Sequence, residues 1–143
     1  MKRRTALAFV ALFCGTSLLH AQEATSKSTS TGVFTAEQAK RGASAYNSNC
    51  ATCHGSELRS ADREVPSLTD RSFKFSWVGK TIAEKFQIAR DTMPPEEKHS
   101  LDDQVYLDIV SYILQFNKIP SGKEPLKPDM QILQQIVIAA PPE

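Results

Sequence analysis

The strongest pattern of apolar residues lies between residues 101 and 117. Apolar side chains recur there every three or four positions, as on one face of an α-helix: Val105, Ile109, Ile113 and Phe116, with Val110 and Leu114 beside them. Asp102 and Asp103 place negative charge at the start of the stretch, where the helix dipole favours it. Pro120 and Gly122 follow its end. The pattern predicts a helix over residues 101–117.

Two weaker patterns predict two more helices. Thr35, followed three positions later by Gln38, is a capping box and predicts a helix from residue 35 to about residue 47. Gly42 in its middle costs about 1 kcal/mol relative to alanine, and is either a tolerated flaw or a place where another helix crosses closely. The second helix is expected over residues 80–91, with three apolar residues on one face: Ile82, Phe86 and Ala89.

The remaining segments show no alternation of apolar and polar residues that would predict a strand. Residues 57–65 are polar and charged and predict a loop. Pro66 favours an extended path through residues 66–68, because proline restricts its neighbour. Residues 129–137 allow one short helix near the C-terminus. The sequence therefore predicts a single all-α domain.

The N-terminus predicts an exported, periplasmic protein. Three basic residues at positions 2–4 precede an apolar run that is short for a membrane span, which is typical of a signal peptide at residues 1–21 with cleavage after Ala21. Cys14 in this run raises the alternative of a lipid anchor. Bulky Phe13 stands against that alternative, because a lipoprotein signal has a small residue there.

The rest of the chain divides into three segments. Residues 22–32 are rich in Ser and Thr and have no large apolar residue, and we expect a flexible linker over residues 22–33. Residues 34–120 are expected to form the folded domain, and residues 121–143 a tail with the short helix. A domain this small buries proportionally little surface and often depends on a disulfide, a metal or a cofactor.

Removal of the signal peptide changes the charge. It takes away three basic residues and no acidic ones, so 14 basic residues stand against 16 acidic ones and the formal charge moves from +1 to −2. A basic surface for nucleic acid is therefore not expected. We also expect no transmembrane segment in the mature chain, because no later stretch is long and apolar enough.

The chemistry is concentrated in residues 48–57, SNCATCHGSE, which bring together Cys50, Cys53 and His54. A disulfide or thiol-exchange pair is one interpretation, but thiol-exchange domains place C-x-x-C after a strand, and no such strand pattern is present. A structural zinc ion is a second interpretation. It needs four ligands, and the mature chain offers the two cysteines, His54 and His99, of which adjacent Cys53 and His54 fit one tetrahedral ion poorly.

Covalent attachment of haem is the third interpretation, and it uses every residue of the motif. C-x-x-C-H is the attachment signature of c-type haem. The two thiols bond to the two vinyl groups of the porphyrin, and the histidine that follows binds the iron. We therefore expect one haem c, attached through Cys50 and Cys53, with His54 as an axial ligand.

Met93 is the expected sixth ligand of the iron. It lies in the sequence Thr-Met-Pro-Pro, where the two prolines stiffen the loop and would hold the sulfur in place. His99 lies among charged residues and suits a solvated surface position. Met130 lies in the tail and suits an apolar anchor. Both stay open as alternatives.

Over residues 35–122 the chain resembles class I cytochromes c of the small, monohaem, exported bacterial type. The resemblance implies a fold in which the N- and C-terminal helices cross beside a covalently bound haem. The residues that correspond to this crossing are Gly42, Tyr46 and Tyr112. It also implies that the carbonyl of Pro66 orients the axial imidazole and that Leu68 packs on the haem. One departure is Val65, which stands where the family often has a glycine.

The surroundings of the haem follow from the same reading. The expected apolar pocket comprises Leu68, Phe73, Phe75, Trp77, Ile82, Phe86, Ile109 and Ile113. Haem propionates are anionic and need donors, for which the candidates are Arg59, Arg71, Lys74 and the indole N–H of Trp77.

The resemblance implies a periplasmic electron carrier, and not an enzyme, that passes one electron at a time through a haem c ligated by His54 and Met93. Its partners would be redox proteins that bind transiently to a monomer. Three segments, around Trp77, at Met93 and at residues 109–122, resemble small cytochromes that serve quinoprotein dehydrogenases. The alternatives are a haem protein with an open or labile sixth site, acting as a sensor or redox-enzyme subunit, and a thiol-exchange protein without haem.

Overall fold

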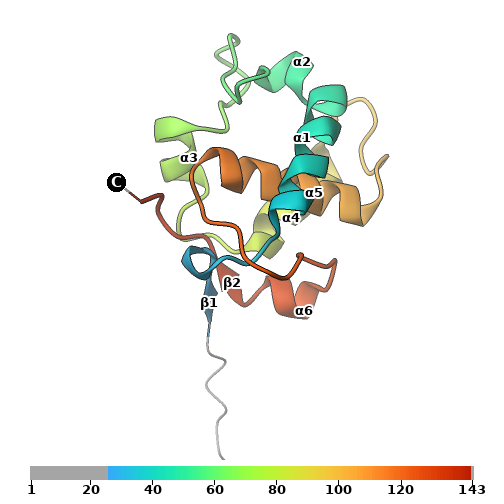
Figure 1. Ribbon diagram of the computed structural model, residues 1–143. Coiled ribbons are helices and arrows are strands. Elements are labelled where there is room, and N and C mark those ends of the chain that lie inside the picture. Colours follow the sequence, from blue (N-terminus) through green and yellow to red (C-terminus); the bar gives the residue numbers. More distant parts are fainter. Residues whose placement is uncertain (1–25, 143) are drawn as a thin grey trace, which may run out of the picture.

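The computed structural model describes residues 26–142. The predicted signal peptide, with Cys14 and the cleavage site after Ala21, lies outside the described residues. The regular secondary structure of the described part is almost entirely helical, with only two strands of two residues each, so the all-α prediction is confirmed (Figure 1). The helices are α1 (Ala36–Asn49), α2 (Ala51–His54), α3 (Asp70–Ser76), α4 (Ile82–Thr92), α5 (Asp103–Phe116) and α6 (Met130–Leu133), with a 3-10 helix η1 (Thr29–Thr31) and two short strands, β1 (Lys27–Ser28) and β2 (Ile136–Val137). Within this range no helix combines the length and apolar character needed to cross a bilayer.

The centre of the fold is the crossing of α1 and α5 (Figure 1). A Cβ atom added to Gly42 would lie 1.8 Å from the carbonyl oxygen of Asp108 and 3.0 Å from the amide nitrogen of Ile109. Because only glycine permits this approach, Gly42 marks a helix crossing, and the alternative of a tolerated flaw is wrong. Tyr46 and Tyr112 pack beside it with ring centroids 5.3 Å apart.

α5 is buried on most of its circumference, which explains why its pattern is the strongest in the sequence. The residues of α5 that are buried include Tyr106, Leu107, Ile109, Val110, Ile113 and Leu114. Phe116, expected at the end of the apolar stripe, is instead 39% exposed, because the helix ends there. α5 receives its contacts mainly from α1, and also from α4.

The N-terminal cap of α1 is confirmed at Thr35, but the predicted role of Gln38 is wrong. The Thr35 hydroxyl accepts a hydrogen bond from the Gln38 amide at 3.0 Å. The Gln38 side chain does not turn back to the cap; it is fully buried and bonds to Asp108 and to both backbone groups of Leu126. A complete capping box forms instead at α4, between Thr81 and Glu84.

Gln38 therefore joins the tail to the helix crossing. Its Oε1 accepts from the Leu126 amide at 2.8 Å, and its Nε2 donates to the Leu126 carbonyl at 3.0 Å. Asp108, 5% exposed, also accepts from Gln104 and from two nitrogens of Arg41. Removing Gln38 leaves a buried backbone N–H without a partner.

We expect Gln38→Met to lower the free energy of unfolding by about 2 kcal/mol, because an unsatisfied buried donor costs about 1–3 kcal/mol. Gln87→Met, at an exposed position of α4, is the matched control and should stay within about 0.5 kcal/mol of wild type. Urea denaturation followed by circular dichroism measures both. Equal stability of the two variants would show that the bonds of Gln38 to Leu126 do not anchor the tail.

Helix α3 was not predicted from the sequence. Its seven residues include two phenylalanines, which have moderate helix propensity, and its first residue, Asp70, has a left-handed φ of 55°. Burial of Phe73, which stacks on Trp77 at 5.5 Å, stabilises this turn through tertiary packing. Phe75 points the other way and is 89% exposed, so its assignment to the haem pocket is wrong.

The two ends of the described chain pair with one another. β1 and β2 form a parallel pair, with Lys27 opposite Ile136, and Thr29 is fully buried. The linker is therefore packed against the tail at residues 27–31, and is not free there. The division into linker, domain and tail stays a prediction.

The tail also clamps the turn before α4. Ile138 accepts from the Gly79 amide at 2.9 Å and donates to the Lys80 carbonyl at 2.8 Å. The short helix expected within residues 129–137 is α6, and the chain then enters β2. The tail thereby fixes the segment that follows Trp77.

Candidate functional site

The C-x-x-C-H motif lies at the junction of α1 and α2. Cys50 ends α1, where its amide donates to the Tyr46 carbonyl at 2.8 Å, and it begins the single turn of α2. The His54 amide then donates to the Cys50 carbonyl at 3.0 Å. Residues three and four positions apart share one face of a helix, so this turn presents Cys50, Cys53 and His54 together. All three line one cavity of about 450 Å³.

The loop after the motif is held by α1. The Tyr46 hydroxyl donates to the Gly55 carbonyl at 2.7 Å, and burial raises the pKa of Tyr46, so the hydroxyl stays protonated as a donor. Gly55 has φ 79°, and a Cβ there would lie 2.0 Å from the Arg59 carbonyl oxygen. Only glycine fits this turn, which returns the chain toward Pro66.

The two thiols are unpaired. Cys50 is half-buried and Cys53 is exposed. Burial raises the pKa of the Cys50 thiol to about 11, and neighbouring Cys53 adds to the shift. A thiol-exchange cysteine has a lowered pKa, because the thiolate is its nucleophile. The site therefore does not suit thiol exchange by Cys50.

His54 is held in one tautomer. It is 8% exposed, and its Nδ1 lies 2.9 Å from the carbonyl oxygen of Pro66. A carbonyl can only accept, so Nδ1 carries the proton and Nε2 keeps its lone pair. This arrangement is common for a metal-binding histidine, whose second nitrogen is oriented by a carbonyl. Val65 in place of glycine does not prevent the contact.

The walls of the cavity are mostly apolar and come from several segments of the chain. Leu68 lies after the Pro66 turn, Trp77 follows α3, and Ile109 and Ile113 extend from α5. Other residues expected in the pocket are displaced from it. Phe73, Ile82 and Phe86 are buried in the core but do not line this cavity.

Met93 lines the same cavity from the end of α4. It is the C-cap of that helix, and the peptide bond to Pro94 is cis. The buried Tyr106 hydroxyl donates to the Met93 carbonyl at 2.9 Å, which fixes the backbone from which the thioether extends. Sequence reasoning missed Tyr106; its signal was a tyrosine hydroxyl on a buried helix, which needs a partner.

The two alternative axial ligands lie elsewhere. His99 is exposed, has φ 61° and places Nδ1 3.9 Å from Asp91. Met130 packs at α6 against the core. Neither lines this cavity. In residues 26–142, no three or more His, Cys, Asp or Glu side chains gather as ligands for a metal ion.

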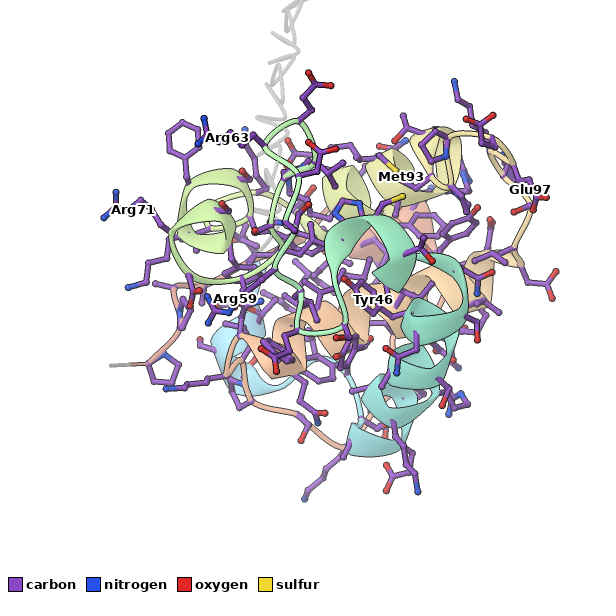
Figure 2. The ribbon with its side chains drawn as sticks, turned by 90° about the horizontal axis from the view of Figure 1, so that it is seen from above. Tyr46, Arg59, Arg63, Arg71, Met93 and Glu97 are labelled. Atoms are coloured by element: carbon purple, nitrogen blue, oxygen red, sulfur yellow. The ribbon has the colours of Figure 1, made fainter. Side chains whose placement is uncertain are left out.

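Three of the proposed propionate donors do not line the cavity. Arg59 forms an ion pair with Asp70, while Arg71 and Lys74 are exposed and do not line the cavity. Figure 2 shows Arg63 and Arg71 at the outer edge of the molecule, away from Met93. The fourth candidate, Trp77, does line the cavity. Lys85, which the sequence reasoning did not single out, lines it as well. Lys85 lies three residues after Ile82 and four before Ala89, so helical spacing already placed it beside the buried face.

Comparison with known proteins gives two matches. A family model described as "Cytochrome C oxidase, cbb3-type, subunit III" matches residues 37–113, which include the motif, Pro66, Trp77 and Met93. A chain in the crystal structure of the sulfane dehydrogenase SoxCD from Paracoccus pantotrophus is similar in fold, with 22% sequence identity and a TM-score of 0.51. The likeness covers 75% of this chain and 60% of that one. A search of the curated proteins gives no match.

Proposed function

The chain belongs to the c-type cytochromes, and on this premise we propose that it is an electron carrier with one haem c, attached through Cys50 and Cys53 and ligated by His54 and Met93. The observation that carries the proposal is the convergence of these four residues, with Pro66, Leu68 and Trp77, on one cavity. Cys50, Cys53 and His54 lie within five positions of the sequence, whereas Met93 lies 39 positions after His54 and lines the cavity from the end of α4.

The residues present fit the cofactor. The cavity volume lies within the range of about 300–1,000 Å³ that is typical of ligand pockets, and its lining is mainly apolar. Two free thiols lie at one side of it, beside an imidazole whose tautomer leaves Nε2 available. A thioether lines the cavity from a different helix. This donor set, with one imidazole and one thioether, is that of an electron-transfer haem.

Each residue would have a separate task. When bound, haem c supplies an iron that alternates between ferrous and ferric states. Cys50 and Cys53 would retain the cofactor, and the Pro66 carbonyl keeps the His54 ring oriented and its Nε2 basic. Met93, with its backbone held by Tyr106, would offer the soft sulfur ligand that favours the ferrous state and raises the potential. Leu68, Trp77, Ile109 and Ile113, which line the same space, would exclude water from it.

We further propose that the carrier works in the periplasm. The predicted signal peptide and the covalent mode of haem attachment support this location. The electron donor is proposed to be a dehydrogenase of the quinoprotein class, on the resemblance of the segments around Trp77 and Met93. The chain of similar fold comes from the structure of a dehydrogenase, SoxCD, and this agrees with a dehydrogenase as the redox partner.

Optical spectra of the secreted, purified protein in the oxidised and reduced states test the proposal. We expect low-spin spectra in both states, and a far-red absorption band in the oxidised state that reports the bond between methionine sulfur and ferric iron. High-spin spectra, with carbon monoxide binding readily to the reduced protein at neutral pH, would favour the open-site alternative instead.

A further inference from the structure

Lys85 extends from α4 into the wall of the cavity. Its Nζ lies 5.5 Å from the centroid of the Trp77 ring, and both residues line the cavity. The side chain is half-buried, and burial lowers the pKa of its ammonium group. An ammonium that is partly removed from water is costly unless an anion accompanies it.

No carboxylate of the described residues forms an ion pair with Lys85, and Glu84, its neighbour in the chain, attracts the ammonium only without direct contact. The acidic residue beside it, Glu84, bonds to the amide of Thr81 and lies 3.9 Å from Lys80. The other cation of α4, Arg90, pairs with acidic residues outside the cavity. Within residues 26–142, no ion pair within 4.0 Å involves Lys85. The Trp77 ring attracts a cation but does not neutralise it.

Lys85 is also the one lysine or arginine among the described residues that line the cavity. Among the described residues, Glu64 is the one carboxylate that lines the cavity. It lies in the exposed loop just before Pro66 and forms no ion pair with Lys85. The cavity therefore presents, next to an indole, a cation that has no direct ion pair.

We propose that Lys85 is the cationic partner of a propionate carboxylate of the haem that this cavity holds. The inference rests on the proposed function, since haem brings two carboxylates to an otherwise apolar space. A lysine ammonium can donate to a carboxylate while its methylene groups remain packed on Trp77. This assignment replaces Arg59, Arg71 and Lys74, and keeps Trp77.

The first test measures contact directly, by proton NMR of the oxidised holoprotein. Propionate methylene resonances are shifted by the iron and can be identified. We expect cross-peaks between one propionate methylene and the Lys85 side chain. Their absence in a protein that carries haem would overturn the assignment.

The second test measures the reduction potential of Lys85→Met, Lys85→Arg and Lys80→Met. Without Lys85 a propionate charge is left unpaired beside the iron and favours the ferric state. We expect Lys85→Met to shift the redox equilibrium about tenfold toward the oxidised form, which is about 59 mV for one electron. Lys85→Arg should retain most of the wild-type value, because its charge is kept.

Lys80→Met is the matched control, because Lys80 is exposed, pairs with Glu84 and does not line the cavity. The equilibrium constant between its oxidised and reduced forms should stay within twofold of the wild-type value. Equal shifts for Lys85→Met and Lys80→Met would overturn the assignment. Failure of the wild-type chain to attach haem would instead refute the proposed function, so the two failures are distinguishable.

Discussion

Replacement of Met93 by alanine is expected to leave the haem covalently attached but to open the sixth position of the iron. Cys50 and Cys53 lie at the junction of α1 and α2, away from the end of α4 that carries Met93, so attachment does not depend on the Met93 sulfur. The oxidised protein should lose the far-red band, and the reduced protein should bind carbon monoxide. The potential should fall by a sizeable part of the range of about 0.8 V over which axial ligands set haem potentials.

Two control variants separate the candidates for this position. His99→Ala and Met130→Ala should each keep the far-red band and the wild-type potential, because neither residue lines the cavity. Unchanged spectra in Met93→Ala, with loss of the band in either control, would move the assignment to that residue. Readily bound carbon monoxide in the wild type would identify an open or labile site.

Replacement of Gly42 by valine is expected to give the largest loss of stability of any single change in α1. The added Cβ would lie 1.8 Å from the Asp108 carbonyl oxygen, and neither helix backbone can yield without separating the crossing. Overpacking a core typically costs about 1–3 kcal/mol and occasionally more. We expect a loss above about 4 kcal/mol here, because the clash is with backbone and not with a flexible side chain.

Ser44→Val is the matched control for this change, since it adds the same side chain at an exposed position of the same helix. Its cost should stay below about 1 kcal/mol, which is the scale of helix propensity. Urea denaturation of the holoproteins compares the two. A loss in Gly42→Val no greater than that in Ser44→Val would contradict the close crossing of α1 and α5.

Much of this fold could be predicted because local signals agreed with the tertiary structure. Thr35 gives the start of α1, and the apolar spacing of residues 101–117 gives α5. A glycine within the helix pattern left a tolerated flaw and a helix crossing open, the family resemblance implied the crossing, and the contact of Gly42 with α5 confirms it. The C-x-x-C-H spacing and the Met93-Pro94 pair are local features of the chain, so the residues proposed to hold and ligate the haem could be named from the sequence alone.

The remainder depends on contacts between distant parts of the chain. Gln38 bonds to Leu126, 88 positions away, and a capping pattern contains no information about such a partner. The pairing of β1 with β2 involves two residues of each strand, too few for an alternating pattern. Phe75 and Phe73 differ by two positions, so only the rotation of α3 decides that one is exposed and the other buried.

The central claim is that this polypeptide carries one covalently bound haem. Its most direct test is the mass of the intact protein purified from the periplasm of a host with haem-attachment machinery. We predict the mass of a chain that begins after Ala21 plus that of one haem, retained after denaturation. The mass of the bare polypeptide, with Cys50 and Cys53 open to thiol reagents, would contradict the account.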